Sequence, residues 1–70
     1  MTEIRASTTG SIWKILVAVG DTIVPGQEVA ILESMKMEIP IEAEVSGRVT
    51  RVLVHEGESV RQDQVLMVSS

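Results

Sequence analysis

The segment IRASTTGSIWKILVAVGDTIVPGQ, residues 4–27, is present a second time in this chain in altered form. Moved by 37 positions, from residue 4 to residue 41, it aligns without a gap with IEAEVSGRVTRVLVHEGESVRQDQ, residues 41–64. Such an internal repeat indicates one supersecondary unit that is built twice, with each copy covering the other's apolar face. The identical pairs are Ile4/Ile41, Ala6/Ala43, Gly10/Gly47, Leu16/Leu53, Val17/Val54, Gly20/Gly57 and Gln27/Gln64.

Both copies have the residue types of short β-strands separated by turns. Their apolar positions are mostly valine and isoleucine, whose stiff side chains favour pleated structure. Residues 24–27, Val-Pro-Gly-Gln, predict a type II turn, since proline fixes φ and the following glycine supplies a positive φ. No segment shows a sustained helical period. The sequence therefore predicts an all-β fold, a flattened barrel or sandwich of two interlocked antiparallel four-stranded sheets related by a quasi-two-fold axis.

The chain is expected to form one domain, residues 1–70. Seventy residues are close to the lower size at which a chain folds on a hydrophobic core alone. The repeat halves cover approximately residues 4–33 and 41–69, and a hairpin at 34–40 joins them. Gly10 and Gly47 should mark bends where a side chain would be in the way. Trp13, which replaces Thr50 of the second half, is expected to fill core space or to cover one end.

The composition argues against several classes of function. A formal net charge of −4 and a single aromatic residue do not suit nucleic acid or anionic lipid. No apolar run could serve as a signal peptide or span a membrane. The absence of cysteine excludes disulfides and thiolate metal sites, and it suits the reducing cytoplasm, where we expect the protein. The single histidine, His55, lies in a predicted turn without partners, so we expect no catalytic residue and no metal site.

The joint between the repeats, SMKMEIP at residues 34–40, has no counterpart within the aligned halves. It holds Lys36, one of only two lysines, and a two-fold axis would place it at one end of the sheets with the chain termini towards the other. The alternation around it also allows an ordinary half-buried strand, with Met35 and Met37 in the core and Lys36 in water. No Asn-Gly or similar hairpin signal is present at residues 35–36. Periodicity alone favours the ordinary strand, whereas the position at the joint between the repeats favours a functional site at Lys36.

The sequence Glu33-Ser34-Met35-Lys36-Met37-Glu38 resembles the attachment motif of biotinyl carrier domains, usually Ala-Met-Lys-Met. The resemblance extends to the flanking strands and covers roughly residues 4–69. Ser34 stands where alanine is usual, a change between small residues that we expect to be tolerated. The chain also has no room for the protruding thumb loop of some bacterial carriers, which many members lack.

The resemblance implies a role for each residue of this hairpin. Lys36 would be linked to biotin through an amide, formed by a biotin protein ligase. Met35 and Met37 would help to mark the lysine for that ligase over lipoate ligase, as soft contacts for a partner's pocket. Glu33 and Glu38 make the hairpin acidic, which either complements basic surfaces on partners or reflects ordinary solvation.

The function implied by the resemblance is that of a non-catalytic carrier within a biotin-dependent carboxylase. The tethered biotin would take a carboxyl group from a biotin carboxylase to a carboxyltransferase, which passes it to an acyl-CoA or a 2-oxo acid. Two alternatives remain: a lipoyl carrier of a 2-oxo acid dehydrogenase or glycine-cleavage system, served by lipoate ligase, and a small β adapter whose lysine is never modified. We expect a monomer when the protein is isolated, as a free-standing subunit or as a domain of a longer chain.

Overall fold

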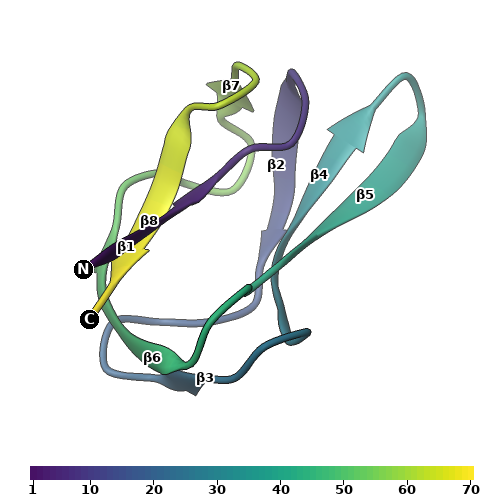
Figure 1. Cartoon of the computed structure of the whole chain (residues 1–70). Helices are drawn as coiled ribbons and strands as arrows, with labels where there is room; N and C mark the ends of the chain where they lie inside the picture. Colours follow the sequence, from purple (N-terminus) through teal and green to yellow (C-terminus); the bar gives the residue numbers. More distant parts are fainter.

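The computed structural model describes all 70 residues and contains eight β-strands. The first sheet has the strand order β1-β8-β6-β3 and the second has the order β5-β4-β2-β7, with every neighbouring pair antiparallel. Figure 1 shows the two sheets as separate layers, with both chain termini on the sheet that does not carry the β4–β5 hairpin. The strands are β1 (Thr2–Arg5), β2 (Gly10–Ile15), β3 (Thr22–Ile23), β4 (Glu28–Ser34), β5 (Met37–Glu42), β6 (Gly47–Val52), β7 (Ser59–Val60) and β8 (Val65–Ser69).

The predicted two-fold relation between the halves is confirmed by the strand bounds. A shift of 37 residues moves β2 onto β6 and β3 onto β7 with the same first and last positions. Each sheet holds two strands from either half, so the halves interlock and neither could form a sheet of this kind alone. The loops obey the same relation, because the amides of Gly26 and Asp63 donate to the carbonyl oxygens of Ala43 and Ala6, each at 2.9 Å.

Equivalent turns in the two halves are closed by the same side chain. The amide of Gln27 donates to Val24 O, and its side-chain Oε1 accepts from the amide of Val24 at 3.2 Å. Gly26 has a φ of 85°, which confirms the predicted Pro-Gly turn. In the second half Gln64 makes the same two bonds to Arg61, and the positive φ falls on an aspartate. The glutamine is therefore kept in both halves because it satisfies the first amide of the turn.

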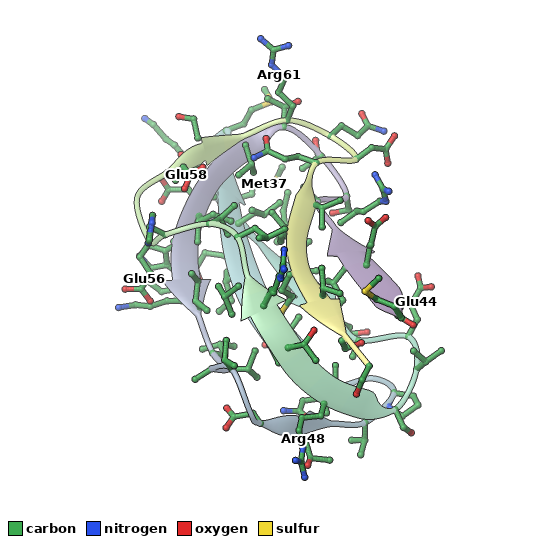
Figure 2. The ribbon with its side chains drawn as sticks, turned by 90° about the vertical axis from the view of Figure 1, so that its left-hand side faces the viewer. Met37, Glu44, Arg48, Glu56, Glu58 and Arg61 are labelled. Carbon is green, nitrogen blue, oxygen red and sulfur yellow. The ribbon has the colours of Figure 1, made fainter.

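The space between the sheets is filled by aliphatic side chains in one cluster. In strands such as β1 and β5 the residues that alternate with these side chains face water, whereas the last four residues of β8 are all buried. Figure 2 shows the charged side chains of Glu44, Arg48 and Arg61 pointing outward on different sides. No helix in the structure has the length and apolarity needed to cross a lipid bilayer. The buried cluster comprises Ile4, Ala6, Ile12, Val17, Ile23, Val29, Ala30, Leu32, Ile41, Ala43, Val49, Val54, Val60, Leu66 and Met67.

The expectation that Trp13 fills core space is wrong. The strand β2 has a β-bulge between Ile12 and Lys14, so Trp13 is an extra residue in the pairing with β4. The bulge places two successive side chains outside, with the indole 43% exposed and the Lys14 Nζ 5.6 Å from its ring centroid. Thr50 is the extra residue of the equivalent bulge in β6, and its hydroxyl donates to Val68 O at 3.1 Å.

Candidate attachment site

The joint between the repeats is a tight hairpin that connects β4 to β5. Ser34 pairs with Met37, so only Met35 and Lys36 form the loop. Their φ angles are 52° and 63°, and positive φ at both central residues is the mark of a type I′ turn. Such turns normally contain asparagine, aspartate or glycine, because most other residues are strained there by about 1–2 kcal/mol. The strain is maintained by the β4–β5 ladder, whose pairs run from Ser34↔Met37 to Glu28↔Glu42.

The exposure of the hairpin excludes the ordinary half-buried strand. Met35 is 89% exposed and Met37 is 59% exposed, although their alternation with Ile39 and Ile41 placed them in the core. The alternation fails because the chain reverses at residues 35–36, beyond the last side chains that pack between the sheets. Ile39 is only half-buried and Ile41 is the first fully buried residue of β5. Two large apolar side chains in water flank the lysine and have no role in the core.

Lys36 is held out at the apex without a partner. Its side chain is exposed, and it takes part in no hydrogen bond or ion pair of the structure. Lys14, the other lysine, instead lies over the Trp13 ring on β2. No side chain of this chain accepts a hydrogen bond from the Lys36 amine, so the hairpin presents an exposed amine with no base beside it.

The remaining predicted residues lie in the last paired rungs of the hairpin. Glu33 on β4 and Glu38 on β5 face each other directly, and both are exposed. Ser34 is half-buried and borders the turn on the β4 side. The two main surface hollows, of about 310 and 470 Å³, are lined by other residues.

The single histidine lies outside the hairpin. His55 is exposed in a turn in which its amide donates to Glu58 Oε1 at 3.0 Å. No group of three or more histidine, cysteine, aspartate or glutamate side chains could hold a metal ion. The site is thus an exposed two-residue hairpin on an eight-stranded fold, with an unpaired lysine at its tip.

Comparison with known proteins gives the family. The family model described as "Biotin-requiring enzyme", for biotin and lipoyl attachment domains, matches residues 2–68. The Bacillus subtilis "Biotin/lipoyl attachment protein" is 57% identical over 58 residues, which cover 83% of this chain and 80% of that protein. The "Biotinylated protein TB7.3 homolog" of Mycobacterium leprae is 38% identical over 97% of this chain and 96% of its own length.

Larger proteins contain the same domain. The biotin carboxyl carrier protein of Nostoc acetyl-CoA carboxylase is 51% identical over 53 residues, and the matched region is 29% of that protein. Urea carboxylase of Kluyveromyces lactis contains a region with a TM-score of 0.92 and 33% identity, covering 99% of this chain and 6% of that enzyme. This chain belongs to the biotin and lipoyl attachment family and is a small carrier domain homologous to biotin carboxyl carrier proteins.

Proposed function

We propose that Lys36 is the attachment site for biotin and that the chain carries the carboxyl group of a biotin-dependent carboxylase. The observation that carries the proposal is the turn itself: an exposed, unpaired lysine lies at the tip of a two-residue hairpin. Met35 and Met37 are exposed on either side of it and are free to enter a partner's pocket. Its relatives are named as an attachment protein, a biotinylated protein and a biotin carboxyl carrier protein, and these names agree with the assignment.

The residues present fit a covalently held group. Lys36 Nζ would form an amide bond to the biotin carboxyl carbon after the ligase has activated that carboxylate with ATP as an acyl adenylate. AMP would leave, and the two protons lost from the ammonium would pass to the ligase. Conversion of an ammonium to a neutral amide removes one positive charge from a hairpin that already holds Glu33 and Glu38. No buried ion pair is broken by this change, because Lys36 has none, so attachment should leave the fold unchanged.

The hairpin also explains how one carrier serves two enzymes. Biotin, once bound, supplies a ring that accepts and releases a carboxyl group. The lysine side chain adds a long flexible stem to the turn, and a tether of this kind raises the local concentration of its end at each site within reach. We propose that those sites are a biotin carboxylase and a carboxyltransferase, by analogy with the acetyl-CoA carboxylase subunit it resembles. The absence of cysteine suits the cytoplasm as the compartment.

Lipoate is the second candidate for the attached group. The family includes lipoyl attachment domains, and the Bacillus relative is named for both groups. The two exposed methionines are the feature of this chain that favours the biotin enzyme, since they enlarge the apolar contact around the lysine.

The test is a direct comparison of the two ligases. Purified unmodified protein is incubated with biotin protein ligase, ATP and biotin, and separately with lipoate ligase, ATP and lipoate. We expect one biotinyl increment in the intact mass in the first reaction and much slower modification in the second. Lipoyl addition alone would assign the protein to lipoyl chemistry. A mass unchanged in both reactions would support an adapter whose lysine is never modified.

A further inference from the structure

The first residue of β2, Gly10, lies at the base of the hairpin that carries Lys36. Strand β2 runs between β4 and β7, and its pairing with β4 begins at Ser11↔Glu33. Figure 1 shows the start of β2 beside the end of β4, at the same end of the sheet as the β4–β5 turn. Gly10 is 26 residues before the lysine in the sequence, from 10 to 36, and the fold brings it next to the last residues of β4.

The backbone of β4 approaches Gly10 too closely for any side chain. A Cβ on Gly10 would lie 2.6 Å from the carbonyl oxygen of Glu33 and 3.3 Å from the Cβ of Ser34. The atom in the way belongs to the backbone, so it cannot rotate aside as a flexible side chain can. The φ of Gly10 is not in the left-handed region, so space, and not backbone conformation, requires the glycine.

The residues against Gly10 are the two that precede the turn. Glu33 and Ser34 end β4, and Met35 and Lys36 follow at once. A displacement of the Glu33 carbonyl is therefore transmitted directly to the turn. The turn cannot readily absorb it by changing its own backbone angles, because its φ angles are already strained. We propose that Gly10 is a positioning residue for the attachment reaction: the absence of its side chain lets β4 seat against β2 and fixes where Lys36 is presented.

This inference rests on the proposed attachment of biotin at Lys36. It adds a residue outside the hairpin to the features that a ligase depends on. Reactions of this kind need the nucleophile within a fraction of an ångström of its productive position, and a misplacement of about 1 Å can cost a hundredfold in rate. The half-buried Ser34 is part of the same contact, so a small residue is needed there as well.

The internal repeat supplies a matched control. Gly47 occupies the position equivalent to Gly10 and is the first residue of β6. A Cβ on Gly47 would collide with the carbonyl oxygen of Ser70, again a backbone atom. Ser70 is the last residue of the chain and is not part of the hairpin. The two glycines therefore make the same kind of contact, but only Gly10 supports the lysine.

The experiment compares Gly10→Ala with Gly47→Ala as substrates for biotin protein ligase. We expect Gly10→Ala to lower kcat/KM about tenfold to a hundredfold, with the loss in kcat. Gly47→Ala should be modified with the kcat of the wild type. A merely destabilising substitution would reduce the folded fraction of the substrate and so raise the apparent KM, with kcat at saturation preserved. The division between kcat and KM therefore separates positioning from stability.

A second measurement uses the unmodified protein and no ligase. In ¹⁵N NMR spectra, we expect Gly10→Ala to shift the amide signals of residues 33–37, and Gly47→Ala to shift those of Ser69 and Ser70. If the wild type accepts no biotin, the proposed function fails, and this spectrum still decides whether Gly10 positions the hairpin. Unchanged signals at residues 33–37 would overturn the inference.

Two further outcomes would also overturn it. One is a wild-type kcat for Gly10→Ala, and the other is an equal loss of kcat in both alanine variants. If Gly10→Ala does not fold, Ser34→Val takes its place, because it adds bulk to the same contact from the β4 side. That variant must then show the loss of kcat, and modification at the wild-type rate would refute the role of this contact.

Discussion

Glu33 and Glu38 face each other directly across the β4–β5 ladder, one pair below the rung that closes the Met35–Lys36 turn. Both carboxylates are exposed, and neither has a cationic partner in the structure. The same ladder has a second pair of this kind, Glu28 opposite Glu42. Like charges in directly opposed positions destabilise a sheet. The repulsion within these two glutamate pairs therefore lowers the stability of the hairpin.

Removal of one charge from the upper pair should stabilise the protein. We expect Glu38→Gln to raise the free energy of unfolding by roughly 0.2–1 kcal/mol, because it ends the repulsion from Glu33 without changing the size of the side chain. The gain should shrink in high salt, since exposed charges are screened. Urea denaturation at low and high salt measures both effects. A loss of stability in low salt would show that the pair is not repulsive.

The strained turn gives a second prediction. Met35 has a φ of 52°, and asparagine adopts this region more readily than methionine does. We expect Met35→Asn to stabilise the fold by about 1 kcal/mol, which corresponds to a rise in Tm of about 4–8 °C for a domain of this size. Thermal unfolding followed by circular dichroism measures it. A Tm below that of the wild type would mean that Met35 contributes packing that its 89% exposure conceals.

The glutamines that close the equivalent turns give a third prediction. Gln27→Ala and Gln64→Ala should each cost about 1 kcal/mol, because each leaves the first amide of its turn without the Oε1 acceptor. The two turns share no hydrogen-bond partner, so the costs should add in the double variant. Gln62→Ala is the control, since that side chain makes no hydrogen bond and should change stability little. Equal losses in all three variants would contradict the role of the turns.

The sequence was sufficient to predict the strand architecture because the repeat makes each half a check on the other. Identical glycines and glutamines fell at equivalent turns, and valine and isoleucine filled the strands between them. The conformation of the hairpin could not be derived in the same way. Residues 35–36 lack the turn signals of a type I′ loop, and their positive φ angles result from the long ladder below them. Alternation alone therefore placed both methionines in the core.

Two further features depend on contacts that no local pattern records. The bulge that turns Trp13 outward depends on the register of β2 against β4. The sequence of β2 alone does not indicate it. Gly10 was expected to mark a bend without room for a side chain, and the structure confirms the lack of room. Only the fold shows that the backbone in the way is that of Glu33, three residues before the lysine.

Lys36, and no other amine of the chain, is the acceptor that we propose for biotin. The most direct test is the intact mass of the protein after co-expression with biotin protein ligase and free biotin, for the wild type, Lys36→Arg and Lys14→Arg. We predict a single biotinyl increment in the wild type and in Lys14→Arg, and none in Lys36→Arg. All three proteins should be folded. A biotinyl increment that survives in Lys36→Arg would contradict the assignment of the hairpin as the attachment site.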